Sequence, residues 1–418
     1  MSQYINTSHN VPESLYHLVF PAKYRRAVFD DNVDDVLKAV CLGIEQRYEI
    51  KFLDVGTDKD HVHFSLSGIN LMTKPTIALF TGDPAGVGPE LIARLLADGG
   101  AAKQANILLI SSRSVLQDAV QITASPFAFV TGDAASVSEN AQENTRRDLD
   151  TPLLLNWPGI NADGFERGKV TPKNGKFMLD GLALAVDLCR KGIADALCFA
   201  PLNKGALRAG GMNHQDELHW FADVLKFTGT CVELNVLEGL WTSRVTSHMP
   251  LKDVSAMLTR EKVAEAVALI TRSLQAAGLA HPRVVVCGFN PHNGDNGSYG
   301  REEIDVIEPG VALARQQGFP ADGPFPADTV FVRATKKDGG YDGVVTMYHD
   351  QGQIAMKLMG FERGVTVQGG LPMPITTPAH GTAYDIAGKG IANVGAMKNA
   401  FALACKMGAA QRGARVAT

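Results

Sequence analysis

Short apolar segments alternate with longer amphipathic segments along most of the chain, from residue 76 onward. The runs 76–80, 107–111 and 283–289 have the length of β-strands. The segments 180–192 and 262–278 repeat their apolar residues with the period of an α-helix. Because a strand that is apolar throughout is buried on both faces, as in a sheet that helices cover, the alternation predicts an α/β fold for this part of the chain.

The composition is that of an ordinary globular protein. Hydrophobic residues make up 45% and charged residues 20% of the 418 residues, which excludes a disordered chain and suggests two or three domains. The net charge of -4 argues against a broad nucleic-acid or membrane-surface binder. No apolar run could span a bilayer, and the first residues do not resemble a signal peptide. The six scattered cysteines form no CxxC pair, so we expect reduced thiols and a cytoplasmic protein.

Residues 1–71 differ from the remainder, because they are rich in charges and aromatics and poor in glycine. Their pattern predicts a helix over residues 32–47 and three strands over residues 15–20, 50–55 and 61–66. His61 and His63 alternate along the last strand, so both imidazoles would lie on one face and could bind a divalent metal. A solvated strand face is the commoner explanation for a pair of this kind.

Two strings in this segment, YHLVFPAKYRRAVF (16–29) and DHVHF (60–64), resemble the single-tyrosine HUH transposases of insertion sequences. In that family the His pair binds the metal and a tyrosine on a later helix attacks DNA. Here the sequence after DHVHF departs from the family, and Tyr16, Tyr24 and Tyr48 all precede the pair. We therefore expect a truncated α+β segment without strand-transfer activity. A gene fusion or an over-extended reading frame ahead of Met72 would explain it.

The string HGTAYDIAGKGIAN, residues 380–393, could bind a nucleotide cofactor. Its small residues Gly381, Thr382 and Ala383 would let the backbone approach a flat ligand closely. Asp385 could accept hydrogen bonds from ribose hydroxyls and would repel a 2′-phosphate, which favours NAD over NADP. The alternative is a glycine-rich loop before a helix, with the aspartate as its cap.

This loop resembles the cofactor loop of the isopropylmalate/isocitrate dehydrogenase superfamily. Five further strings occur in a fixed order along the chain: GDPAGVGPE, PLNK, SHMPLKDV, GFNPHNGDNGSYGREE and MYHDQG. They narrow the resemblance to the 4-hydroxythreonine-4-phosphate dehydrogenase family, over about residues 74–410. The resemblance implies a three-layer α/β/α fold in two subdomains with the active site in the cleft. Residues 72–200 and 350–418 would bind NAD, and 201–349 would bind substrate and metal and form a dimer. The implied NAD-binding residues are His380, Gly381, Thr382, Ala383, Asp385, Ile386 and Asn393.

Three histidines, His248, His292 and His349, lie in loops or at strand ends that follow separate apolar segments. Such loops converge at one edge of a sheet, which makes these residues candidate metal ligands. The resemblance implies one divalent cation whose ligands are shared across a homodimer interface. Three imidazoles suit Zn²⁺ best, with Mg²⁺, Mn²⁺ or Co²⁺ as alternatives. The cation would act as a Lewis acid on the substrate hydroxyl.

The remaining candidates are residues that move protons or contact substrate. Lys204 closes an apolar segment and is a candidate proton carrier, because a nearby metal would lower its pKa. Asp350 follows His349 and could orient that ligand or move a proton. Lys357 matches a lysine that contacts substrate in the resembled family, and Thr366 stands where that family has a substrate-binding asparagine.

The sequence departs from the family where the substrate phosphate is bound. In the best register the candidate substrate contacts Asp216 and Glu217 stand in place of a histidine and a threonine, and Ile375 stands in place of an arginine. A shift of register could return His214 or His219 to this position. Two acids without the arginine would repel a phosphate dianion. We therefore expect an unphosphorylated hydroxy acid or carboxylated diol as substrate, oxidised with loss of CO₂ from the keto acid. The alternatives are the 4-hydroxythreonine-4-phosphate dehydrogenase of B6 synthesis and, in another class, a DNA-binding transposase remnant.

Overall fold

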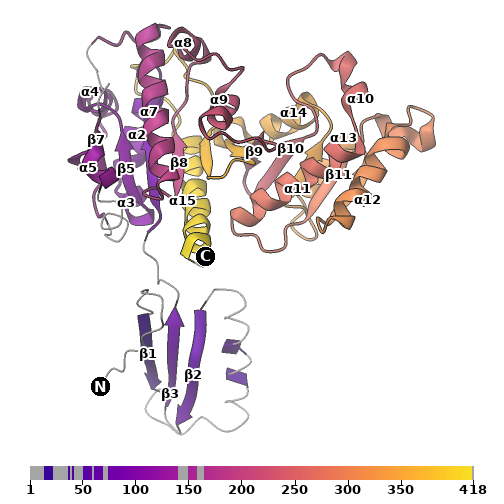
Figure 1. Cartoon of the computed structure of the whole chain (residues 1–418), viewed down its shortest axis with the longest axis horizontal. Coiled ribbons are helices and arrows are strands. Elements are labelled where there is room, and N and C mark those ends of the chain that lie inside the picture. The colour runs from indigo at the N-terminus through magenta and orange to yellow at the C-terminus, as the bar shows by residue number, and fades with distance from the viewer. Residues whose placement is uncertain are drawn as a thin grey trace. The chain divides into compact units, whose positions relative to one another are not determined.

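The structure is a computed structural model, and it describes residues 14–21, 36–37, 40–41, 50–58, 61–68, 74–139, 149–157 and 164–416. Contacts between residues divide the chain into two compact units, 1–73 and 74–418. Figure 1 draws both units, with the first in indigo and the second running from indigo to yellow. The predicted subdomain boundaries near residues 200 and 350 lie within the second unit and stay a prediction.

The first unit contains a three-stranded antiparallel sheet in the order β1-β3-β2. Its strands are β1 (Ser14–Pro21), β2 (Ile50–Asp58) and β3 (His61–Gly68), close to the predicted ranges. His61 and His63 lie on the central strand, opposite Pro21 and Val19 of β1. Residues 36, 37, 40 and 41 are helical, and the rest of the predicted helix over 32–47 lies outside the described residues.

The second unit is built on one twelve-stranded sheet, whose strand order differs from the order of the chain. From one edge to the other the strands are β12 (Ala321–Phe325), β11 (Val284–Cys287), β13 (Gly343–Thr346), β10 (Leu240–Arg244), β9 (Val232–Leu237), β14 (Val365–Gly369), β15 (Ile375–Pro378), β8 (Ala196–Phe199), β4 (Thr76–Phe80), β5 (Asn106–Ile110), β7 (Leu153–Asn156) and β6 (Val130–Asp133). Apolar runs of four or five residues form most of them, as the sequence pattern predicts.

The sheet consists of two parallel blocks joined by an antiparallel centre. Strands β12, β11, β13 and β10 run parallel, as do β15, β8, β4, β5, β7 and β6. Between the blocks, β9 pairs antiparallel with both β10 and β14, and β14 pairs antiparallel with β15. A two-residue turn joins β9 to β10, with φ of 49° at Glu238 and 91° at Gly239, as tight hairpins require.

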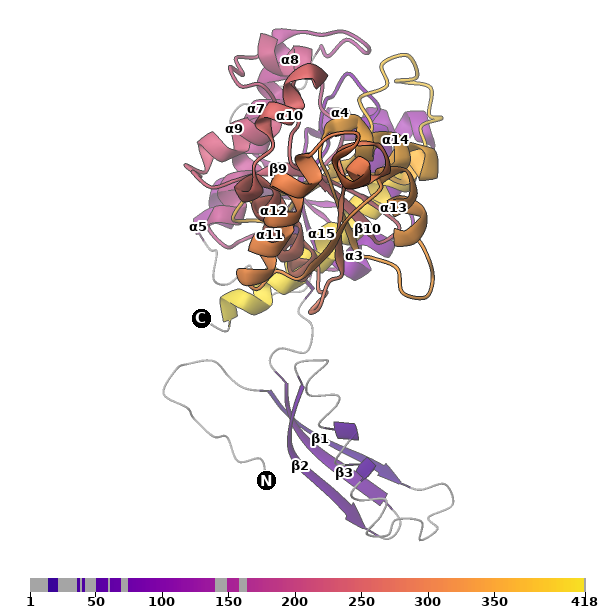
Figure 2. The same ribbon diagram turned by 90° about the vertical axis from the view of Figure 1, so that its right-hand side faces the viewer.

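Helices cover one face of this sheet continuously. The helices α2 (Gly88–Leu96), α11 (Arg260–Ala276), α12 (Glu308–Gln316) and α15 (Gly395–Val416) pack there on a single apolar core. Figure 2 shows α11 and α12 side by side. The sheet with helices on both faces confirms the predicted α/β fold. None of the helices described, including the 22-residue α15, is apolar enough over its length to cross a membrane.

On the opposite face the helices form two separate groups with a gap between them. The helices α7 (Pro172–Arg190), α8 (Lys204–Ala209) and α9 (Glu217–Val224) cover the block around β4 and β8. The helices α13 (Ala327–Ala334) and α14 (His349–Gly360) cover β11 and β13. Between the two groups the antiparallel strands turn polar side chains toward this face: Glu233, Asn235, Arg244 and Thr366. Two cavities open along this strip, one lined by Glu233 and Arg244 and one lined by Asn235, and together they are called the cleft below.

The contact between α7 and α8 places Lys204 at the side of the cleft. Asn203 caps α8 by accepting a hydrogen bond from the Ala206 amide at 2.9 Å. Gly175 of α7 lies so close to α8 that an added Cβ atom would meet the Ala206 carbonyl oxygen at 1.8 Å. Only glycine permits this approach of the two helix backbones.

We predict that Gly175→Ala lowers the free energy of unfolding by about 2 kcal/mol or more, because the methyl group forces α7 and α8 apart. Chemical denaturation would measure the change. Gly413→Ala in α15 is the matched control, because no atom lies within 4 Å of its added Cβ. This control should raise stability by up to about 1 kcal/mol through helix propensity. Equal stability of the two variants would contradict the prediction.

Candidate active site

Lys204 and Glu217 meet on the α7 side of the cleft, each as the first residue of its helix. The Lys204 Nζ atom lies 3.8 Å from Glu217 Oε2, and that oxygen accepts no hydrogen bond within the described residues. Burial raises the pKa of the Glu217 carboxyl, and the Lys204 charge opposes that rise. The lysine side chain is half exposed, so it can reach a bound substrate. The structure thus brings together the predicted proton carrier Lys204 and the predicted substrate contact Glu217.

Asp216 lies beside them but its carboxylate is engaged within the fold. It caps α9, with Oδ1 accepting a hydrogen bond from the His219 amide at 3.0 Å and lying 2.5 Å from His219 Nδ1. Burial opposes ionisation of the carboxyl, but the hydrogen bonds from His219 outweigh it and lower the pKa of Asp216. The predicted contact between Asp216 and substrate stays a prediction, whereas the hydrogen bond from the His219 amide shows that Asp216 caps α9.

Two of the three predicted metal ligands face each other across the cleft floor. His248 follows β10, His349 begins α14, and their ring centroids are 5.4 Å apart. Asp350 Oδ1 lies 2.7 Å from His349 Nδ1, which orients the ring and leaves Nε2 for a metal. Partial burial and the nearby Arg244 charge lower the pKa of His248 and favour the neutral imidazole that binds cations.

His292, the third predicted ligand, lies in a loop of unusual conformation. Residues 292–296 all have positive φ, between 42° and 78°. The buried carboxylate of Glu303 holds this loop by accepting hydrogen bonds from the Phe289 and Asn290 amides at 2.7 and 2.6 Å. Across the described residues, no three His, Cys, Asp or Glu side chains gather closely enough to hold a metal ion. One chain therefore presents two imidazoles together, which suits a site that a second chain completes.

Sequence reasoning missed the polar network on the cleft floor. The Arg244 guanidinium donates to Glu233 Oε2 and Ser247 Oγ, both at 3.0 Å, and to Asn235 Oδ1 at 3.4 Å. Asn235 in turn donates to Thr366 Oγ1 at 3.4 Å, so a predicted substrate-binding residue belongs to this network. The network forms only because the β9–β10 hairpin brings its residues together. The alternation of polar and apolar residues in β9 was the one signal available in the sequence.

The two other positions tied to substrate recognition lie apart from this network. Lys357 is an exposed residue of α14 and lines a small cavity together with Asn235 and Gln353. Ile375, which stands where the resembled family has an arginine, is 0% exposed and packs in the apolar core beneath α9. No substrate group can therefore reach the side chain at position 375.

The predicted cofactor loop, residues 380–393, is held by α2 and by the segment that joins β4 to α2. Glu90 is almost fully buried, and its two carboxylate oxygens accept hydrogen bonds from the Gly388 and Gly390 amides at 2.6 and 2.9 Å. Asp83, also buried, accepts a hydrogen bond from the Tyr384 hydroxyl at 2.5 Å. Burial raises the pKa of Asp83 and of Tyr384. These supports were not predicted.

The loop offers the surface that a dinucleotide requires. An added Cβ on Gly381 would have no atom within 4 Å, and Asp385 is exposed, so both can meet a ligand. The His380 Nε2 atom is buried and has no hydrogen-bond partner in the described part of the chain. Asn393 is exposed but its Oδ1 accepts from the Gly395 amide at 2.8 Å, which helps begin α15. These features fit the predicted NAD site.

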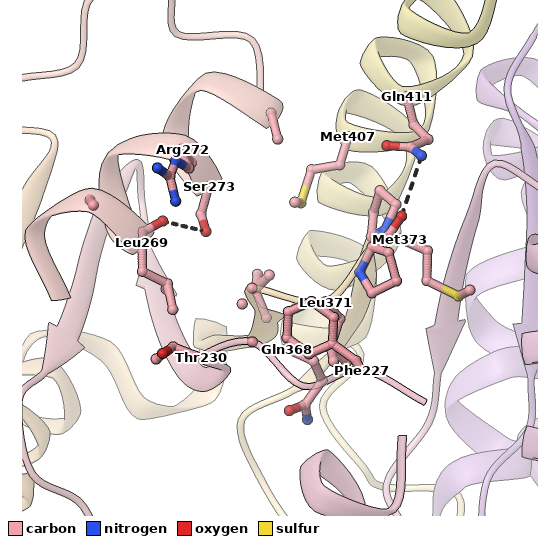
Figure 3. Close-up of a pocket in the computed structure, with 18 of the residues that line it drawn as sticks. Phe227, Thr230, Leu269, Arg272, Ser273, Gln368, Leu371, Met373, Met407 and Gln411 are labelled. Carbon is pink, nitrogen blue, oxygen red and sulfur yellow. Dashed lines mark hydrogen bonds between the residues drawn. The ribbon is translucent and has the colours of Figure 1, made fainter. Parts of the chain in front are cut away.

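A cavity of about 480 Å³ lies on the other face of the sheet, between α11 and α15. Figure 3 shows Leu269, Arg272 and Ser273 from α11 on one side and Met407 and Gln411 from α15 on the other. Its lining includes none of the residues predicted to bind substrate, metal or cofactor. The cavity is therefore separate from the candidate active site.

Comparison with known families gives two matches along the chain. Residues 103–404 match the family model described as pyridoxal phosphate biosynthetic protein PdxA, and residues 10–76 match the model described as transposase IS200 like. A Pseudomonas aeruginosa protein named "Putative 4-hydroxythreonine-4-phosphate dehydrogenase 2" is 53% identical over 81% of this chain and 99% of its own length. A Halalkalibacterium halodurans protein named "Putative D-threonate 4-phosphate dehydrogenase" is 34% identical over 80% of this chain and 97% of its own.

Solved structures give the same result. The crystal structure of a 4-hydroxythreonine-4-phosphate dehydrogenase from Burkholderia phymatum is 34% identical with a TM-score of 0.68, and the match covers 80% of this chain and 99% of that one. A terephthalate 1,2-cis-dihydrodiol dehydrogenase from Burkholderia xenovorans is 26% identical with a TM-score of 0.55, over 79% of this chain and 98% of that one. Both resemblances predicted from the sequence motifs are thereby confirmed.

We predict that Glu90→Gln weakens NAD binding by about tenfold, because an amide cannot accept from both loop N–H groups and one buried donor loses its partner. Fluorescence titration of the full chain with NADH would measure the dissociation constant. Glu166→Gln, at an exposed glutamate outside the loop, is the matched control and should leave it unchanged. Unaltered NADH binding by Glu90→Gln would show that these two hydrogen bonds do not shape the cofactor site.

Proposed function

The chain belongs to the family of the pyridoxal phosphate biosynthetic protein PdxA and is an NAD-dependent dehydrogenase that acts on a hydroxyl group, and from this premise we propose that its substrate is a phosphorylated four-carbon hydroxy acid. The observation that supports the reaction is that Lys204 pairs with Glu217 and lies close enough to His248 to lower its pKa, while His248 faces His349. The phosphate is supported by the names of the relatives. The reaction would oxidise a secondary alcohol, with loss of CO₂ from the resulting keto acid.

The names of the relatives support a phosphorylated substrate better than the unphosphorylated acid expected from the sequence. The relatives described above that match this chain at 53% and 34% identity are both named for a 4-phosphate ester. The Lys204 ammonium, 3.8 Å from Glu217 Oε2, offsets the charge of that acid, whereas Asp216 keeps its charge while it caps α9 and counts against a phosphate. Positive charge is supplied nearby by Lys204 and Arg244.

The residues of the chain have distinct tasks in this proposal. Lys204 would exchange a proton with the substrate, and Glu217 beside it would receive or return that proton. Asp350 would keep the His349 ring oriented. A divalent cation held by His248, His292 and His349 would polarise the substrate hydroxyl when bound, and three imidazoles suit Zn²⁺ best. The loop around Asp385 would hold NAD against the substrate.

A second candidate function is the oxidation of an unphosphorylated hydroxy acid or carboxylated diol. The observation that favours it is Ile375, whose buried aliphatic side chain offers no charge to a phosphate. The likeness to the terephthalate dihydrodiol dehydrogenase structure points the same way. Residues 10–76 match the transposase model, and the DNA-binding alternative for this segment stays a prediction.

We predict that NADH forms with 4-phosphohydroxy-threonine or D-threonate 4-phosphate with a kcat/KM at least about 100-fold above that for the dephosphorylated acids. Absorbance of NADH in a screen of paired acids, each with and without the phosphate, would measure this ratio. Such a ratio arises when a substrate without the phosphate leaves a buried charged group of the enzyme unpaired. A ratio near one, or below it, would overturn the phosphorylated substrate and favour the second candidate.

The metal site should draw on two chains of a homodimer. We predict that His248→Ala and His292→Ala are each inactive alone, and that their mixture after joint refolding recovers about a quarter of the wild-type activity. Half of the dimers would then be mixed, and each mixed dimer would hold one intact site of two. A mixture of His248→Ala with itself is the control. No recovery in mixed dimers verified by mass spectrometry would place all three ligands in one chain.

A further inference from the structure

Arg244 is a buried arginine on the floor of the cleft that the reaction does not otherwise use. Its side chain is 5% exposed and borders a cavity of about 320 Å³ that His248 and His219 also line. A guanidinium has five N–H donors, and Arg244 uses three of them within the described residues, for Glu233, Ser247 and Asn235. One N–H donor on each terminal nitrogen therefore has no partner among the described residues, and the side chain lines the cavity.

Arg244 and the predicted metal ligand His248 line the same cavity, together with the acids Asp216 and Glu233. The position where the resembled family has an arginine holds the fully buried Ile375. Among the described residues that line the cavity, Arg244 is the one buried cation. A planar guanidinium with two neighbouring donors suits the paired oxygens of a phosphate.

We propose that Arg244 is the specificity-determining residue that binds the phosphate of the substrate, in place of the arginine lost at position 375. This inference rests on the proposed function, since it names the group that recognises the phosphorylated end. The phosphate accepts hydrogen bonds from the two remaining N–H donors. The reacting hydroxyl then lies toward His248 and His349.

Glu233 holds Arg244 in place and sets the strength of this site. Its side chain is 18% exposed and accepts from the guanidinium at 3.0 Å. With this partner the buried arginine is neutralised when no ligand is present, which avoids the cost of an unpaired buried charge. The same carboxylate repels an arriving phosphate, so it limits affinity and permits product release. Removal of the Glu233 charge should therefore tighten anion binding, and removal of the Arg244 charge should abolish it.

The test measures two variants that each remove one charge. They should change the recognition of phosphate in opposite directions. Arg244→Gln should lower kcat/KM for the phosphorylated hydroxy acid about 100-fold more than for its dephosphorylated partner. Glu233→Gln should bind inorganic phosphate at least about tenfold more tightly than the wild type, measured by calorimetry on the full chain. Arg190→Gln, at an exposed arginine of α7, is the matched control for the lost charge and should change neither value.

Each outcome decides the proposal. Equal losses for both substrates in Arg244→Gln, or phosphate binding unchanged in Glu233→Gln, would overturn it, because the arginine would then be structural or would bind the carboxylate. If Arg244→Gln melts below the assay temperature, the phosphate affinity of Glu233→Gln alone decides. Calorimetry does not require turnover, so tight phosphate binding without activity on any phosphorylated acid would contradict the proposed function and leave the Arg244 site standing.

Discussion

The reversal of strand direction at the centre of the sheet creates the cleft on which the candidate site depends. Parallel strands need crossover connections, and these place helices over the faces of both outer blocks. The central strands β9 and β14 are antiparallel, and β9 reaches β10 through a two-residue turn. No crossover helix is needed there, so one face stays open between α9 and α14. Polar residues can line that face because water and ligands reach it.

Buried carboxylates hold the loops that border this cleft. Glu90 binds two amides of the cofactor loop, Glu303 binds two amides beside His292, and Asp216 caps α9. A carboxylate that accepts several backbone hydrogen bonds is a strong and directional anchor. Each of these carboxylates binds the backbone of a segment that carries a predicted site residue: the cofactor loop, the loop with His292, and the start of α9 with Glu217. The loops are thereby held near their working geometry before any ligand arrives.

The sequence predicted the elements well and the contacts between them poorly. Apolar runs such as 76–80 and 284–287 are buried strands, because full burial leaves a clear compositional mark. The capping role of Asp216 was not predicted, although an aspartate directly ahead of a helical segment is a common cap; its contact with substrate stays a prediction. Arg244 was overlooked, because its pairing with Glu233 depends on the hairpin register and not on any local pattern.

The exchange of arginine for Ile375 also has a physical explanation in the sheet. A buried guanidinium needs a carboxylate beside it, and Glu233 is that carboxylate on β9. Arg244 lies on the adjacent strand β10, whereas Ile375 lies on β15, two strands away from β9 and thus about 10 Å distant. Position 375 is surrounded by apolar side chains beneath α9, where a charge would have no partner. The carboxylate therefore determines which strand can carry a buried arginine, and in this chain that strand is β10.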